Sequence, residues 1–93
     1  MATAARSEYP HIMVDPRVCH GHPCIAGTRI RVMDVVAAHQ AGRSAEELQD
    51  YFSTRPLTLG EVHAALGYYH DHREEIEADF AHDERLSAEF ESA

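Results

Sequence analysis

The residues most able to do chemistry lie in one short segment, 19–24, which reads CHGHPC. Cysteine sulfur and histidine nitrogen are among the ligands that zinc prefers in proteins. A structural zinc site usually takes two ligands from one tight turn and two from a distant segment, whereas these four groups would have to wrap one ion within a single loop. We therefore expect no metal, reduced thiols at Cys19 and Cys24, and exposed imidazoles at His20 and His22.

The sequence offers few of the other parts that an enzyme needs. Apart from the two cysteines it has no distinctive nucleophile and no Gly-rich phosphate-binding loop, and its acids gather in a segment with the pattern of a solvated helix. We accordingly expect no catalytic residue, no cofactor and no enzymatic activity.

Charge is distributed unevenly along the 93 residues, whose formal net charge is −8. Residues 1–55 contain six arginines and six acids, and residues 56–93 contain two arginines and ten acids. An acidic C-terminal part repels nucleic acid and membranes but suits a basic groove, so the two halves are expected to meet different partners. No apolar run approaches the roughly 18 residues that span a bilayer, and no secretory signal is evident, so we expect a cytoplasmic protein.

Two short extended segments are expected to form a strand pair near the N-terminus. Residues 1–10 have the composition of a flexible arm, and residues 12–14 form a brief apolar run. Glycines and a proline then permit turns before a second extended segment at 28–32, where alternation places Ile30 and Val32 on one face.

The period of the apolar residues becomes helical after Val32. A first helix is expected over about 32–41, and Gly42 lies where a left-handed residue would end it. A second helix follows, and its pattern directs inward the side chains of Leu48, Tyr51 and Phe52.

Two capping boxes mark helix starts, one at Ser44 with Glu47 and one at Thr58 with Glu61. The helix that opens at the second box is expected to continue unbroken past Phe80. Two capped helices separated by a short break are typical of a helix-turn-helix. The predicted fold is therefore mainly α, with a three-helix unit in residues 11–70, preceded by a short β-hairpin or strand pair, and a long acidic helix in 71–93.

Three segments, HPCIAGTRIRV, AGRSAEELQDYF and LTLGEVHAALGYY, resemble the bacterial domain-of-unknown-function family 433, the VapB-type antitoxins. The resemblance covers about residues 12–70. It implies a homeodomain-like three-helix unit behind a small β-element, a PIN-like ribonuclease toxin as partner, and binding to operator DNA. Its most specific motif is the ordered set Gly21, Pro23, Ile25, Gly27, Thr28 and Arg29.

DNA binding would depend on few basic residues, because phosphate neutralisation supplies most non-specific affinity. The expected recognition helix begins near Leu59 and exposes no Arg or Lys. The expected DNA-binding residues are Arg29, Arg31, Arg43, Arg55 and His63. In the alternative interpretation the three-helix unit is only a packing scaffold, and its arginines are solvated or pair with Glu46, Glu47 and Asp50.

The C-terminal segment combines a narrow apolar line with many acids, as groove-binding helices do. We expect its apolar residues to anchor it on the toxin, its acids to steer association, and an arginine, Arg85 or else Arg73, to enter the toxin's acidic metal pocket. The expected toxin-binding residues are Tyr69, Arg73, Ile76, Phe80, Arg85, Leu86 and Phe90. The alternative without a binding role is a solvated helix or a disordered end.

The leading hypothesis is thus a type II antitoxin that occludes a ribonuclease with its C-terminal helix and represses its own operon. It would act as a homodimer or as a hetero-oligomer with the toxin, away from membranes. The competing class is a stand-alone helix-turn-helix regulator or adaptor that homodimerises through its C-terminal helix. A zinc-dependent sensor is the third class.

Overall fold

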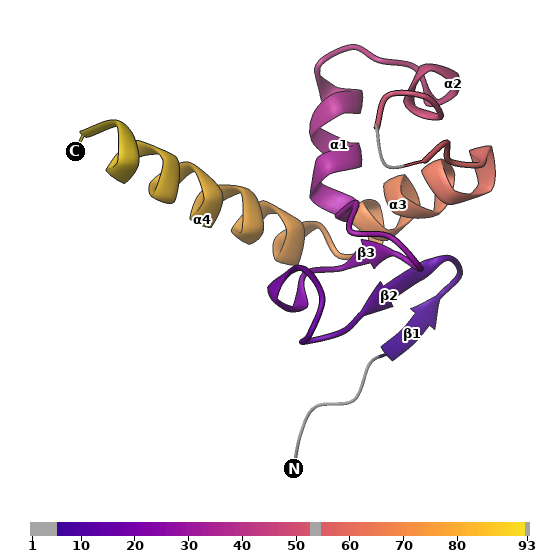
Figure 1. Ribbon diagram of the computed structural model, residues 1–93, viewed down its shortest axis with the longest axis horizontal. Coiled ribbons are helices and arrows are strands. Elements are labelled where there is room, and N and C mark those ends of the chain that lie inside the picture. Colours follow the sequence, from indigo (N-terminus) through magenta and orange to yellow (C-terminus); the bar gives the residue numbers. More distant parts are fainter. Residues whose placement is uncertain (1–5, 53–54, 93) are drawn as a thin grey trace.

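The computed structural model describes the backbone of residues 6–52 and 55–92, and the side chains of residues 9–52 and 55–83. Four α-helices follow a three-stranded antiparallel sheet with strand order β1-β2-β3. The sheet lies beside the first three helices, and the last helix leaves the body at one side (Figure 1). The predicted class, mainly helical with a small β-element in front, is confirmed.

The sheet consists of β1 (Arg6–Tyr9), β2 (Ile12–Val14) and β3 (Cys24–Ile25). Ile12 lies opposite both Tyr9 and Ile25, so the central strand is β2. The prediction of a flexible arm is wrong for residues 6–9, which pair with β2; residues 1–5 lie outside the described residues.

The predicted strand at 28–32 is also wrong, because this stretch is a turn that leads into a helix. Thr28 donates its backbone N–H and its hydroxyl to the Ile25 carbonyl, at 3.0 and 2.8 Å, and its hydroxyl accepts from Ile30 N at 3.0 Å. These bonds close the turn tightly. Extended pairing is limited to one isolated bridge between Cys24 and Arg31.

The loop between β2 and β3 contains the short 3-10 turn η1 (Cys19–Gly21). Cys19 and His20 both have left-handed backbone angles, with φ of 51° and 56°. Such angles cost roughly 1–2 kcal/mol for a residue with a Cβ, so the surrounding hydrogen bonds must hold them. Two of these run from Gly21 N to the Val18 carbonyl at 3.0 Å and from His22 N to the Cys19 carbonyl at 3.1 Å.

Helix α1 (Val32–Gln40) confirms the first predicted helix, and Gly42, with φ of 110°, lies just beyond its end. Helix α2 (Ala45–Leu48) is one turn, opened by the Ser44 and Glu47 capping box. The inward placement of Leu48 is confirmed, since it is fully buried. Tyr51 is 47% exposed and Phe52 only partly buried, because the helix ends before either can turn inward.

Helix α3 (Leu59–Asp71) opens at the predicted capping box of Thr58 and Glu61. It does not continue unbroken: His72 has φ −131° and ψ 40°, and α4 (Arg73–Ser92) starts after it. The His72 ring stacks on Tyr68, with centroids 3.9 Å apart and planes at 11°. The change of direction brings the first turns of α4 onto α1 and α3.

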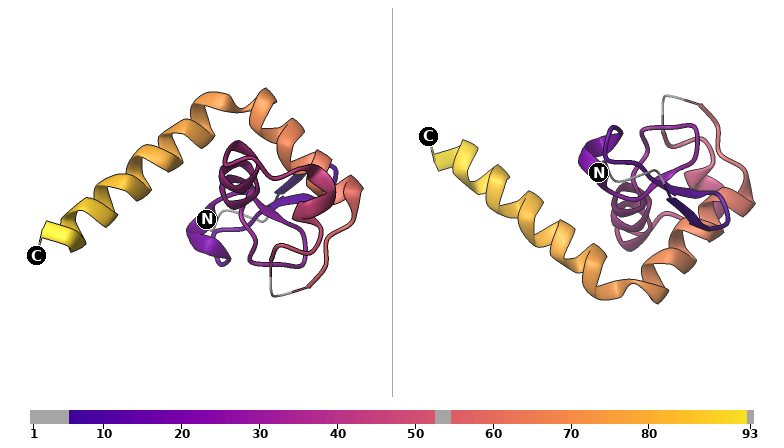
Figure 2. Two further views of the ribbon diagram at one scale, coloured as in Figure 1. Left: turned by 90° about the horizontal axis from the view of Figure 1, so that it is seen from above. Right: turned by 90° about the horizontal axis from the view of Figure 1, so that it is seen from below.

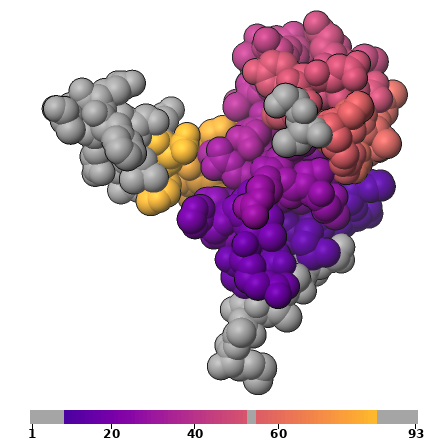
Figure 3. Space-filling view, in the orientation of Figure 1, coloured from indigo at the N-terminus to yellow at the C-terminus, as the bar shows by residue number. Residues whose placement is uncertain are grey.

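One core joins all these elements. α1 packs on α3, and both helices pack on α4. α3 also packs on β2 and β3 of the sheet. Fully buried aliphatic side chains come from β2, β3 and each α-helix: Ile12, Ile25, Val32, Val35, Val36, Leu48, Val62 and Ile76. The space-filling view shows sheet, loop and first three helices as one continuous body (Figure 3). Within the described residues, none of the helices combines the length and apolar character that a membrane crossing requires.

Candidate functional site

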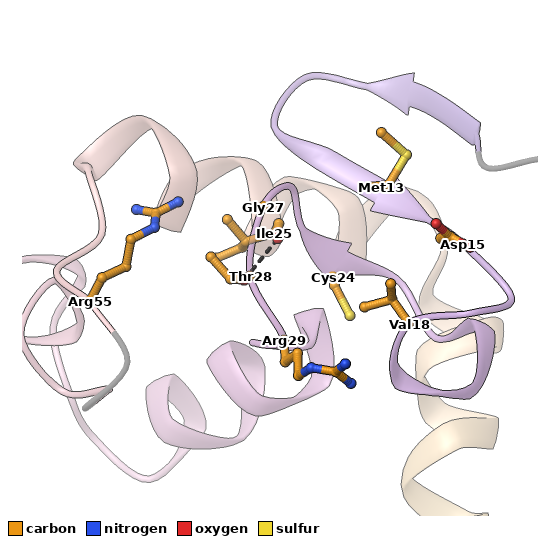
Figure 4. Close-up of a pocket in the computed structure, with 9 residues that line it drawn as sticks. All are labelled: Met13, Asp15, Val18, Cys24, Ile25, Gly27, Thr28, Arg29 and Arg55. Carbon is orange, nitrogen blue, oxygen red and sulfur yellow. Dashed lines mark hydrogen bonds between the residues drawn. The ribbon is translucent and has the colours of Figure 1, made fainter.

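A hollow of about 530 Å³ opens beside the Gly27-Thr28-Arg29 turn, and we call it the turn hollow (Figure 4). Its apolar floor comes from the sheet and the loop, and two arginines stand on opposite sides of the turn. The lining residues are Met13, Asp15, Val18, Cys24, Ile25, Gly27, Thr28, Arg29 and Arg55.

The turn presents Arg29 to solvent. Gly27 has φ of 79°, where a side chain would strain the backbone, and Thr28 closes the turn through its hydroxyl. Arg29 follows at once and is exposed. Within residues 9–52 and 55–83, no carboxylate lies within ion-pair distance of its guanidinium. The motif therefore builds a rigid support for one unpaired positive charge.

A second hollow, between α1 and the segments before and after α2, has a volume of about 450 Å³ and also borders Arg29. We call it the helix hollow; its lining is Arg29, Ile30, Asp34, Ala37, Ala38, Ala41, Arg43, Tyr51 and Phe52. The Arg43 guanidinium lies 4.3 Å from the centre of the Tyr51 ring, a cation–π contact. The sequence predicted Tyr51 as a core residue, and its role beside Arg43 depends on where α2 ends.

The other two predicted DNA-binding arginines are neutralised by carboxylates. Arg31 pairs with Asp34 at 2.8 Å, and Arg55 pairs with Glu61 at 2.8 Å. Hydrogen bonds from Arg55 hold the pKa of Glu61 at about 2, well below its ordinary value. The alternative interpretation named Glu46, Glu47 and Asp50 as partners of the arginines; the acids that pair with Arg31 and Arg55 are instead Asp34 and Glu61.

The predicted DNA-binding set therefore divides in space. Arg29 and Arg43 both border the helix hollow, whereas the charge of Arg31 is paired with Asp34 at the start of α1. His63 is exposed on α3 and lines neither hollow. Glu61, in the first turn of the expected recognition helix, is only 8% exposed and so is not available to a DNA groove.

The predicted toxin-binding residues are also found in different environments, some in the core and some at the surface. Tyr69 and Ile76 are 8% and 0% exposed and belong to the core, so their predicted place on an exposed apolar stripe is wrong. The break at His72 causes this, because it turns α4 against the body. Phe80 is partly buried against the core, and Arg73 is exposed with its guanidinium 5.5 Å from the Tyr69 ring centre. The side chains of Arg85, Leu86 and Phe90 lie outside the described residues.

Polar bonds fasten the first half of α4 to the body. Tyr69 donates its hydroxyl to Glu77 at 2.7 Å, and this bond raises the pKa of Tyr69. Asp79 Oδ1 lies 3.2 Å from Nδ1 of His22, which comes from the loop before β3. Sequence reasoning missed the His22 contact, since no pattern relates positions 57 residues apart.

The two cysteines are not joined by a disulfide, and each thiol makes a local hydrogen bond to the backbone. Cys19 donates to the Arg29 carbonyl at 3.4 Å and Cys24 to the His22 carbonyl at 3.3 Å. Burial raises the pKa of Cys24, which keeps it protonated. Among the residues that the structure describes, no three histidines, cysteines or acids are grouped so as to hold a metal ion.

Comparisons with known proteins agree with this architecture. A family model described as a protein of unknown function, DUF433, matches residues 12–69. The crystal structure of a DUF433 member protein from Anabaena variabilis is 35% identical, with a TM-score of 0.68 over 76% of this chain and 68% of that chain. The curated proteins gave no match. By both comparisons, with the family model matching residues 12–69, the chain belongs to the DUF433 family.

Proposed function

We propose that this protein is the antitoxin of a type II toxin–antitoxin system and neutralises a PIN-like ribonuclease with the projecting half of α4. The observation that carries the proposal is the course of α4 itself. Its first turns pack against α1 and α3, with Ile76 buried, and the remainder runs away from the body (Figures 1 and 2). A helix held at one end and extended at the other is suited to enter a groove on a second protein.

The chemistry of α4 supports a basic partner. Residues 73–93 carry eight acids and two arginines. A ribonuclease needs a basic rim for RNA and an acidic pocket for its metal, so carboxylates on the helix would meet the rim and one arginine would meet the pocket. Arg85 is the proposed arginine, and exposed Arg73 is the second candidate.

The apolar anchors are fewer than the sequence pattern indicated. With Tyr69 and Ile76 committed to the core, the anchors proposed for the toxin are Phe80, at the edge of the body, and Leu86 and Phe90 further along. Buried aromatic anchors at an interface contribute 2 kcal/mol or more each when truncated.

Co-expression with a PIN-like ribonuclease, where one is encoded beside this gene, tests the proposal. Leu86→Ala together with Phe90→Ala should release toxicity and weaken binding by at least roughly 30-fold. Exposed Ala81→Ser on the same helix is the matched control and should leave neutralisation intact. Unchanged affinity in the double variant would show that α4 does not bind the toxin.

Operator binding is a second candidate function, and Arg29 and Arg43 favour it. They are charged, they border adjoining hollows, and Arg29 is presented by a rigid turn. α2 and α3 would form the helix-turn-helix, with phosphate contacts beside it instead of along α3. If no toxin gene adjoins this one, a stand-alone regulator or adaptor that homodimerises through its C-terminal helix becomes the better proposal.

A further inference from the structure

We propose that, in the absence of any other partner, the projecting half of α4 from one copy docks in the turn hollow of a second copy, and that the exchange is reciprocal. This inference goes beyond the proposed function and requires no toxin. It assigns the turn hollow an occupant, which is an acidic amphipathic helix of this same chain.

The turn hollow suits an apolar side chain framed by carboxylates. Met13, Val18 and Ile25 line it with carbon atoms, and Arg29 adds a charge that no described carboxylate neutralises. The other two charged residues in its lining are Asp15 and Arg55, and both form ion pairs. Asp15 pairs with Arg17 at 3.1 Å, and Arg55 pairs with Glu61. The hollow therefore favours a negative ligand.

The projecting half of α4 has the complementary chemistry. Residues 83–93 hold four acids and one arginine. Leu86 and Phe90 are spaced four residues apart, which places them on the same face of the helix, because α4 continues to Ser92. One apolar residue of this pair can enter the hollow while a neighbouring acid meets Arg29.

The same copy cannot supply this helix. Ile76 is fully buried and fixes where α4 leaves the body. From there to the helix end at Ser92 the axis rises by about 24 Å at 1.5 Å per residue, and it runs away from the body (Figure 2). A continuous helix cannot bend back over that length, so the occupant must come from another molecule.

Reciprocal exchange strengthens the contact. A two-fold dimer repeats each residue pair, so it buries two helix-in-hollow contacts for one loss of translational and rotational freedom. The contact is also partly electrostatic, so added salt should weaken it. Operator DNA would engage Arg29 too, so the two complexes would exclude each other.

Sedimentation equilibrium of the full chain, with no toxin present, tests the proposal. The wild type should dimerise with a dissociation constant that rises with salt. Arg29→Glu alone, and Glu84→Arg with Glu89→Arg alone, should each weaken dimerisation by at least roughly tenfold. Arg73→Glu, which makes the same charge change at an exposed site on α4 that does not line the turn hollow, is the control and should dimerise normally.

Mixing the two reversed proteins gives the decisive result. One protein has a reversed charge in the hollow and the other has reversed charges on α4. A heterodimer of the two should form, because in both of its contacts opposite charges again meet. Circular dichroism of each variant confirms that it is folded. A monomeric wild type at all concentrations, dimers indifferent to either reversal, or a mixture that stays monomeric would each overturn the proposal. Because no toxin enters the assay, none of these results bears on neutralisation.

Discussion

Arg55 and Glu61 are joined by two hydrogen bonds, Nη1 to Oε1 at 3.0 Å and Nη2 to Oε2 at 2.8 Å. The same Glu61 carboxylate accepts from the backbone N–H of Thr58 at 2.9 Å, and so closes the capping box of α3. One side chain therefore fixes both the start of α3 and the loop before it. The pairing also removes Arg55 from the charges available to a phosphate or a carboxylate of a partner.

Stability should fall in acid through Glu61. Its pKa is about 2 in the folded protein, below the ordinary 4.5 of an unfolded chain, because Arg55 and Thr58 stabilise the carboxylate. A lowered folded pKa stabilises the protein above pH 4.5, and this contribution disappears as the pH falls from 4.5 to about 2. The free energies of unfolding of wild type and Glu61→Gln, measured by urea titration, should differ most near neutral pH. They should converge as the pH falls from 4.5 to about 2. A constant difference would contradict the assignment.

Ile76 should be more important for stability than its position in an acidic tail indicates. It is fully buried, so Ile76→Ala removes core packing and should lower the free energy of unfolding by about 2–5 kcal/mol. Exposed Ala78→Ser, two residues along α4, is the control and should change stability by less than about 0.5 kcal/mol. Chemical denaturation measures both, and an equal effect would mean that α4 is not part of the core.

The Tyr9 hydroxyl should be the reason why position 67 favours glycine over alanine. A Cβ at position 67 would lie 2.7 Å from the Tyr9 hydroxyl, which itself donates to Asp71 at 3.0 Å. In a helix interior, Gly→Ala otherwise stabilises by about 1 kcal/mol. Gly67→Ala should therefore yield its full gain only with Tyr9→Phe, where the nearest remaining atom is 3.7 Å away. A double-mutant cycle by urea unfolding measures the coupling, and additivity would contradict the contact.

Arg29 and Arg43 should dominate any affinity for operator DNA. Removing each phosphate contact reduces the dependence of log K on log salt by about one, so Arg29→Ala with Arg43→Ala should lower that slope by about two. Arg17→Ala is the control, since Arg17 is exposed but paired with Asp15. Fluorescence anisotropy against salt with upstream DNA is the measurement. A wild-type slope near zero would remove operator binding from the proposal.

Local signals in the sequence were sufficient for the helix starts and the fold class. The Ser44 and Thr58 caps, the helical period after Val32 and the position of Gly42 act within a few residues, so they can be recognised in the sequence. The burial of Cys24 was likewise predicted correctly, because it follows a proline turn and precedes an apolar residue.

Tertiary structure decided what the side chains face. A helical period cannot show that His72 breaks the long helix, and without the break Tyr69 and Ile76 had the pattern of an exposed stripe. Nor can spacing show which arginines meet a carboxylate, because Arg31 and Arg55 differ from Arg29 and Arg43 only in what packs beside them. Packing joins residues distant in sequence, such as His22 and Asp79, and even the short-range pairs of Arg31 and Arg55 depend on how the folded backbone directs each side chain.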